Sequence, residues 1–172
     1  MNNILEFKKQ ELKLLENSNF SNQNPMRFLK WFLKNAQSFT KVDLKKSEEV
    51  SVKTDSQIKM CYHNCWKALL DYRKFRYFEG FVWSKELPLP LEHSWLVDTK
   101  GRVIDPTLII NAQETARQMK KKYGIEDHFK RQFRIGDEYL GIEFPYKKLN
   151  KLVFQYKRTG SFLPELFLSG EI

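Results

Sequence analysis

The chain is poor in the residues that build metal sites and disulfide frameworks. Its 172 residues include only 2 cysteines and 3 histidines. Cys61 and Cys65 are four positions apart, which places them on one face of a helix. A structural disulfide within a single helical turn is geometrically unfavourable, and in a cytosolic protein it would be reduced. Structural zinc usually takes four ligands, and there is no second cysteine pair. We therefore expect two free thiols, no metal and no cofactor.

Long apolar runs are also missing. No run approaches the roughly 20 residues that a membrane-spanning helix needs. The first nine residues contain no apolar stretch of the kind found in secretory signals. We expect a cytoplasmic protein with no membrane partner. Hydrophobic residues still make up 41% of the chain and aromatic residues 15%, which is enough for a folded core and argues against disorder.

The charge is strongly basic, with a formal net charge of +9. Basic charge attracts nucleic acid or acidic partners, but here it is spread along the whole chain. The densest cluster is Lys120-Lys121-Lys122, followed by Lys130, Arg131 and Arg134. No RNA-recognition, helix-turn-helix or zinc-finger pattern accompanies it. We interpret the cluster as a solvated helix face, and nucleic acid stays open as a partner without being favoured.

Apolar periodicity predicts helices in the first half of the chain. Helices are expected over residues 3–16, from Asn24-Pro25 to near Ser38, and from Asp55 or Ser56 to about Tyr72. Residues 41–55 are polar, with a short strand or a loop at Val50-Ser51-Val52. We divide the chain into an N-terminal helical segment, residues 1–50, and a main domain, residues 51–172, which we expect to form one compact unit.

The second half alternates in a strand-like way before it returns to helix. Strands are expected over residues 77–83, 93–98, 102–104 and 139–145, a helix over 111–122, and docked apolar segments over 149–156 and 162–168. Residues 125–137 show no clear pattern. Helices, a strand meander and further helices predict an α+β fold with a small antiparallel sheet.

Three residues suit a cysteine-nucleophile triad: Cys61 in the third predicted helix, His93 on a strand and Asp105 at the end of the next strand. A thiol attacks only as the thiolate, and a free cysteine has a pKa near 8.5. A helix N-terminus and a neighbouring imidazolium both lower that value. Asp105 would orient the imidazole and stabilise its charge.

The hairpin that joins the two strands provides a geometric test. A three-residue turn, Thr99-Lys100-Gly101, places Asp98 opposite Arg102, so that paired positions sum to 200. His93 and Asp105 are then diagonal neighbours on one face, roughly 7–8 Å apart at the backbone. A two-residue turn would put them on opposite faces. The triad hypothesis therefore predicts a turn of odd length, with Gly101 in the left-handed conformation.

Supporting residues are predicted around the thiol. The backbone amide of Cys61 and the side chain of Gln57 are candidate oxyanion donors, and Asn64 is expected to support the site from the helix. Cys65 is interpreted as a small buried hydrophobic residue. Taken separately, each of these residues also has an ordinary structural explanation, and spacing adds little to their combination.

A resemblance to a known family strengthens the triad hypothesis. The elements Cys61-x-x-Asn64, Tyr77-x-x-Gly80-Phe81, Glu92-His93-Ser94-Trp95, Val103-Ile104-Asp105-Pro106-Thr107 and Tyr139-Leu140-Gly141-Ile142 resemble the papain-like cysteine–histidine–aspartate superfamily, which includes the NlpC/P60 and transglutaminase-like enzymes. More narrowly, they are similar to uncharacterised bacterial and phage proteins with a Glu-His-Ala-Trp and Asp-Pro-Thr signature. The likeness covers about residues 57–145. Ser94 stands where that signature has Ala, and Cys65 where a small residue is usual.

The resemblance implies a papain-like fold with Cys61 as nucleophile, His93 as base and Asp105 as orienting residue. We expect an acyl-transfer enzyme that hydrolyses a peptide-like or isopeptide-like amide through a thioester at Cys61. Deamidation or transglutamination of a protein glutamine is the alternative within the same chemistry. A non-catalytic papain-like scaffold that binds nucleic acid or an acidic partner is the alternative outside it.

Overall fold

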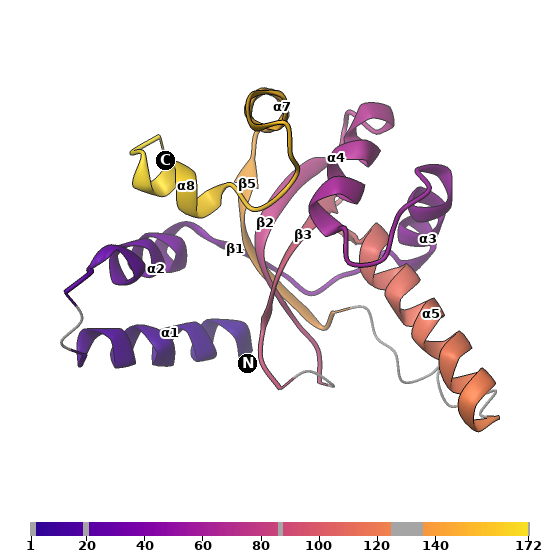
Figure 1. Cartoon of the computed structure of the whole chain (residues 1–172), viewed down its shortest axis with the longest axis horizontal. Helices are drawn as coiled ribbons and strands as arrows, with labels where there is room; N and C mark the ends of the chain where they lie inside the picture. The colour runs from indigo at the N-terminus through magenta and orange to yellow at the C-terminus, as the bar shows by residue number, and fades with distance from the viewer. Residues whose placement is uncertain (1–2, 19–20, 86–87, 125–135, 172) are drawn as a thin grey trace.

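The sheet at the centre of the fold is antiparallel throughout. The computed structural model describes residues 3–18, 21–85, 88–124 and 136–171 (Figure 1). Its elements are α1 (Asn3–Glu16), α2 (Asn24–Asn35), β1 (Gln37–Phe39), α3 (Leu44–Lys53), α4 (Cys61–Asp71), β2 (Arg76–Trp83), β3 (Leu91–Val97), β4 (Val103–Ile104), α5 (Pro106–Tyr123), β5 (Glu138–Phe144), α7 (Tyr146–Tyr156) and α8 (Leu163–Leu168). The strands follow the order β1-β5-β2-β3-β4, and each neighbouring pair is antiparallel. This confirms the α+β class with an antiparallel sheet.

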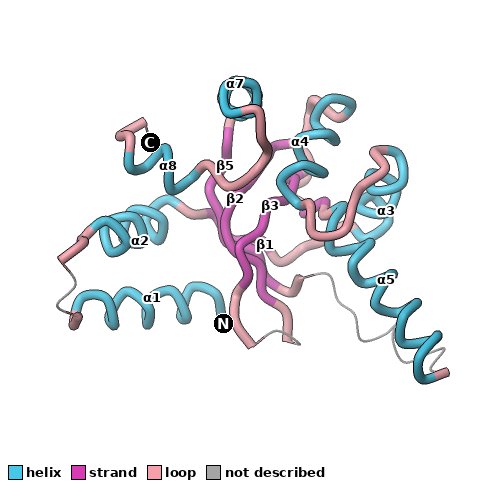
Figure 2. Tube along the Cα trace, viewed as in Figure 1, coloured by secondary structure: helices cyan, strands magenta, loops and turns pink. Residues whose placement is uncertain are grey.

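Alternation along the strands divides the core between the two faces of the sheet. Tyr77 and Leu96 are paired across β2 and β3 and join a large apolar cluster with α1, α2, α3, α4, α7 and α8. Phe78 and Trp95, the next pair, join a smaller cluster with the start of α5. Figures 1 and 2 show α1, α2 and α8 on one side of the strands and α3 and α5 on the other. Successive residues of β2, β3 and β4 therefore join different apolar clusters.

The stretch predicted as a strand or loop at Val50-Ser51-Val52 is helical, and that prediction was wrong. It belongs to α3, which begins where the Asp43 side chain accepts a hydrogen bond from the Lys46 amide at 3.0 Å. Val50 and Ser51 are buried in the helix. Packing of this face therefore outweighs the strand preference of the two valines.

Two other boundaries differ from the sequence prediction. α2 ends at Asn35 and not near Ser38, and residues 37–39 form the edge strand β1. α5 begins at Pro106 and not near 111, because Asp105 caps it. Lys130, Arg131 and Arg134 of the predicted basic cluster lie outside the described residues, as do most of 125–137.

The N-terminal helices are joined to the sheet by polar as well as apolar contacts. The Glu138 carboxylate at the start of β5 accepts hydrogen bonds from the Asn3 side chain and the Ile4 amide, at 2.8 and 3.1 Å. It thus caps the first turn of α1. Phe32 of α2 is fully buried in the large cluster. The predicted division into segments 1–50 and 51–172 stays a prediction, and α3 runs across it without a break.

Within the ranges described, no helix is long and apolar enough to cross a membrane.

A buried carboxylate anchors the C-terminal segment. Glu79 in β2 is fully buried. Its oxygens accept hydrogen bonds from the Tyr77 hydroxyl, the Phe162 and Leu163 amides and the Ser161 hydroxyl, at 3.0, 2.9, 3.3 and 3.3 Å. Burial outweighs these bonds and raises the pKa of Glu79 from 4.5 to about 7. The carboxylate therefore holds the start of α8 to the sheet and titrates close to neutral pH.

Replacing Glu79 by Gln tests this pKa. Because the pKa is higher in the folded than in the unfolded chain, the contribution of Glu79 to stability is full below about pH 4.5 and is lost as the pH rises through about 7. The stability of the wild type relative to Glu79→Gln should therefore fall by about 3 kcal/mol over that interval. Urea unfolding of both proteins from pH 4 to pH 8 measures the difference. A constant difference across the range contradicts the raised pKa.

Candidate active site

The predicted nucleophile is the first residue of its helix. α4 begins at Cys61, and the helix does not start at Asp55 or Ser56 as predicted. Asp55 and Lys59 both have positive φ, 47° and 62°, which interrupts any helix through this segment. Cys61 thereby lies in the first turn, where the backbone amides have no intrahelical acceptor and the helix dipole favours negative charge.

Asn64 fixes the loop that leads into this helix. Its side-chain amide donates to the Gln57 carbonyl at 2.7 Å and to the Thr107 hydroxyl at 2.8 Å, and its side-chain oxygen accepts from the Gln57 amide at 2.9 Å. Asn64 is fully buried. Its donors are thus both used to hold the loop before Cys61 and the start of α5, so its role in this structure is support.

The hairpin has the predicted register. Leu96 pairs with Ile104 and Val97 with Val103, and the Gly101 amide donates to the Asp98 carbonyl at 3.0 Å. Gly101 has φ 74°, the left-handed conformation that the three-residue turn requires. The expected parity is therefore confirmed. It brings His93 and Asp105 to the same face of the sheet.

The Asp105 carboxylate is shared between two tasks. One oxygen, Oδ1, accepts from the Thr107 and Leu108 amides at 3.1 and 3.0 Å and caps α5. The other, Oδ2, lies 2.7 Å from Nε2 of His93 and accepts from the Tyr139 hydroxyl at 3.1 Å. The carboxylate is fully buried. The hydrogen bonds from α5 and β5 therefore fix the orientation of the carboxylate independently of its contact with His93.

The electrostatics couple Cys61 to His93. Burial disfavours the imidazolium, but the Asp105 carboxylate outweighs burial and raises the pKa of His93 from 6.5 to about 10. Burial likewise disfavours the Cys61 thiolate, but the neighbouring His93 side chain and the backbone of Ser94 outweigh burial and lower the pKa of Cys61 below 9.0. Since Nε2 faces Asp105, Nδ1 is the ring nitrogen that remains for the thiol. The arrangement favours a thiolate–imidazolium pair.

Cys65 has the opposite character. It is fully buried, and its thiol lies 3.4 Å from the Ser94 carbonyl, to which it donates. Burial raises the pKa of Cys65 well above 9.0. Both cysteines are free. The interpretation of Cys65 as a small buried residue is confirmed.

Three residues to which the sequence analysis assigned no role in the site support the imidazole. Trp95 stacks beside His93 with ring centroids 6.5 Å apart, and Tyr139 packs edge-on against Trp95 at 5.2 Å. The indole has room only because Gly141 lies beneath it: a Cβ at Gly141 would come within 2.5 Å of the Trp95 ring. Tyr139 and Gly141 lie two residues apart on β5, so strand alternation places them on one face. That alternation was the signal available for finding them.

A narrow cleft of about 20 Å³ is lined by sequence neighbours of the site residues, but not by Cys61, His93 or Asp105 themselves. Three of its lining residues are next to Cys61 or His93 in the sequence or in the sheet. Tyr62 follows Cys61, Glu92 precedes His93, and Gly80 is paired with His93 across β2 and β3. The remaining lining residues are Phe28, Phe32, Phe81, Ser161, Leu163 and Pro164. The cleft is thus mostly apolar and ends at the segment that Glu79 anchors.

The oxyanion role predicted for Gln57 stays a prediction. The structure fixes the backbone of Gln57 through Asn64 and leaves the residue exposed. No group of three or more His, Cys, Asp or Glu side chains suited to a metal ion occurs among the described residues.

Comparison of the chain with protein-family models, with curated proteins and with solved structures gave no match.

Alkylation by iodoacetamide distinguishes the two thiols. With 9% of its surface exposed and a lowered pKa, Cys61 should react well below pH 9, whereas Cys65 should stay inert in the folded protein. In His93→Ala, burial is no longer offset and the rate at pH 7 should fall by at least about tenfold, since each pKa unit is a factor of ten in thiolate. Peptide mapping of the alkylated protein measures each site.

The matched control is Cys65→Ala, which should leave the rate and pH profile of alkylation unchanged. An unaltered Cys61 profile in His93→Ala would contradict the thiolate–imidazolium pair.

Asp105→Asn and Asp105→Ala separate the two tasks of this side chain. Asn caps helices about as well as Asp, so Asp105→Ala should be less stable than Asp105→Asn by about 1 kcal/mol, the value of the cap alone. Both variants remove the negative charge beside His93, so both should shift the pH profile of Cys61 alkylation upward. Thermal unfolding and alkylation are measured on the same samples. Wild-type alkylation in Asp105→Asn would show that the charge of Asp105 is not what sustains the pair.

Proposed function

We propose that this chain is a thiol enzyme of papain-like type that transfers the acyl group of an amide through a thioester at Cys61. One observation carries the proposal: the thiol of Cys61 lies at a helix N-terminus, the neighbouring His93 lowers its pKa, and the buried Asp105 carboxylate lies 2.7 Å from that imidazole. A nucleophile, a base and an orienting group in this order suit acyl transfer. A nucleophile helix packed on an antiparallel sheet supports the papain-like fold.

In the first half of the reaction, the Cys61 thiolate attacks the carbonyl carbon of the amide and a carbon–sulfur bond forms. The electron pair of the carbonyl moves to oxygen. When this tetrahedral intermediate collapses, the carbon–nitrogen bond breaks, and the leaving amine takes the proton from Nδ1 of His93. The products are a thioester on Cys61 and a neutral imidazole beside Asp105.

In the second half, water or an amine attacks the thioester while His93 accepts its proton. The carbon–sulfur bond breaks, and the thiolate–imidazolium pair is restored. Water yields an acid, and a primary amine yields a new amide. The buried Asp105 stabilises the imidazolium at both stages without itself taking the proton.

The developing oxyanion needs donors near Cys61. The amides of the first turn of α4 supply them in part, because they have no intrahelical acceptor. Gln57 is the candidate side-chain donor: its backbone is held by Asn64, and its side chain is left free of that clamp. Hydrolysis of a peptide-like amide is the favoured reaction. Deamidation or transglutamination of a protein glutamine uses the same groups and differs only in the amide and in the acceptor.

Unfolded casein with an added fluorescent primary amine tests all three reactions at once. Mass spectrometry separates chain cleavage, conversion of glutamine to glutamate, and attachment of the amine. We expect one of these products from the wild type and a loss of at least about a thousandfold in Cys61→Ala, because the nucleophile has no substitute.

Cys65→Ala is the matched control and should retain the activity. A product that forms equally in Cys61→Ala would overturn the assignment of the nucleophile. Absence of every product, together with an unreactive Cys61, would replace the enzyme by a non-catalytic scaffold.

A further inference from the structure

α7 is an exposed helix whose positive charge no side chain of its own segment offsets. From Pro145 to Pro164 the sequence contains no Asp or Glu and five cations: Lys147, Lys148, Lys151, Lys157 and Arg158. Two of the lysines occupy the first turn of α7, where the helix dipole disfavours positive charge. Within the described part of the chain, no carboxylate forms an ion pair with Lys147, Lys148, Lys151 or Lys157. The helix is therefore left with a charge that an external anion would neutralise.

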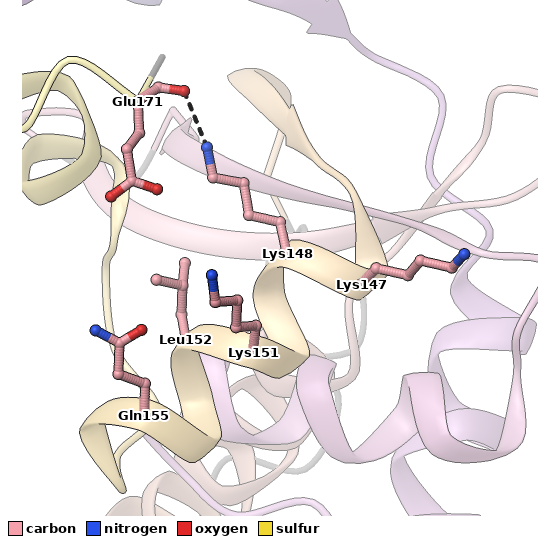
Figure 3. A pocket seen from close by; sticks show the side chains of 6 residues that line it. All are labelled: Lys147, Lys148, Lys151, Leu152, Gln155 and Glu171. Carbon is pink, nitrogen blue, oxygen red and sulfur yellow. Dashed lines mark hydrogen bonds between the residues drawn. The ribbon is translucent and has the colours of Figure 1, made fainter.

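A groove of about 580 Å³ runs along one side of α7. It is lined by Lys147, Lys148, Lys151, Leu152, Gln155 and Glu171. Figure 3 shows Lys148 and Lys151 projecting toward the segment that carries Glu171, while Lys147 points away along the outer edge. Lys148 and Lys151 are three positions apart on the helix and so share a face. Buried Leu152 gives the groove an apolar floor beneath these cations.

A second groove of about 470 Å³ follows the other side of α7, toward α4. It is lined by His63, Trp66, Val153, Phe154, Lys157, Arg158 and Thr159. Phe154 is 67% exposed, although it is a large apolar residue. His63 and Trp66 are in the first two turns of the helix that begins with Cys61. Both sides of α7 thus combine apolar side chains with at least one lysine that is not in an ion pair with a described carboxylate, whereas Arg158 is paired with Glu165.

The chain itself shows how a polypeptide lies against this helix. The Lys148 ammonium donates to the main-chain carbonyl of Glu171 at 3.0 Å, and the Glu171 side chain lines the same groove (Figure 3). A main-chain oxygen and an acidic side chain are therefore already accommodated beside the lysines. This contact favours an acidic polypeptide over a nucleic acid, whose phosphates would bring neither a peptide carbonyl nor an apolar side chain for the floor.

We propose that α7 and its two grooves form a docking site for an acidic polypeptide segment that carries apolar residues between its carboxylates. The lysines bind the carboxylates, and Leu152 and Phe154 receive the apolar side chains. Complementary charge of this kind acts mainly on the rate of encounter and on the choice of partner. The binding does not depend on the chemistry proposed at Cys61 and is measured without it.

Fluorescence anisotropy with a labelled 16-residue peptide of Glu interspersed with Leu tests the site at low and at physiological salt. The protein is the full chain with Cys61→Ser, so that no reaction can consume the probe. We expect binding that weakens as salt rises. The double variant Lys148→Glu/Lys151→Glu should raise the Kd by at least about tenfold.

The matched control is Lys45→Glu/Lys100→Glu, on α3 and in the β3–β4 turn, which lowers the net charge by the same four units, from +9 to +5. It should leave the Kd within about twofold of the parent value. Equal losses in both double variants, or no binding at all, overturn the proposal. Tighter binding of a single-stranded 16-nucleotide probe at equal salt also overturns it. If circular dichroism shows that the Glu variant is misfolded, Lys148→Gln/Lys151→Gln decides by the same criteria.

Discussion

The Asp105 carboxylate is the constraint on which the arrangement of the site depends. Its two oxygens accept four hydrogen bonds, which come from α5, β3 and β5. The Asp105 amide in turn donates to the Ser47 hydroxyl of α3 at 2.9 Å. Because the carboxylate is buried, none of these partners can be exchanged for water at low cost. The same carboxylate therefore determines both the start of α5 and the orientation of His93.

The part of this arrangement that follows from local rules could be predicted from the sequence. A turn that ends at Gly101 sets the pairing of β3 with β4, and strand alternation then sets the side of the sheet on which His93 and Asp105 lie. The α+β class follows from the order of the helical and strand-like segments. Neither inference needs knowledge of distant contacts, which is why both agree with the structure.

The helix starts could not be predicted in the same way. Asp105-Pro106 was interpreted as the end of a strand, although the same pair is an N-cap and a first helical residue. α3 depends on burial of Val50 against distant elements, which its polar sequence does not reveal. α4 starts at Cys61 because Lys59 has the left-handed backbone conformation. Lysine rarely adopts this conformation, so the sequence gives no signal for it. The roles of Tyr139 and Gly141 required the fold, since they lie more than thirty residues from Asp105.

Two carboxylates are fully buried in a chain whose net charge is basic. Asp105 and Glu79 are fully buried and are bound mainly by hydrogen bonds from backbone amides, hydroxyls and one imidazole. The lysines of α7, by contrast, lie at the surface. A basic net charge therefore coexists with an acidic interior around the site. The field at Cys61 is set by a few nearby groups and not by the composition of the chain.

Asn64 has a consequence for the variation that the loop before Cys61 can accept. Its side chain binds Gln57 through the main-chain amide and carbonyl alone. Any residue except proline at position 57 offers both groups. The hydrogen bonds with Asn64 therefore depend on the number of residues between positions 57 and 64 and not on the side chain at position 57. Replacements at 58–60 leave that length intact, whereas one inserted or deleted residue shifts Cys61 relative to His93. The loop is therefore strict in length, and the left-handed conformation of Lys59 also restricts the residues that position 59 accepts.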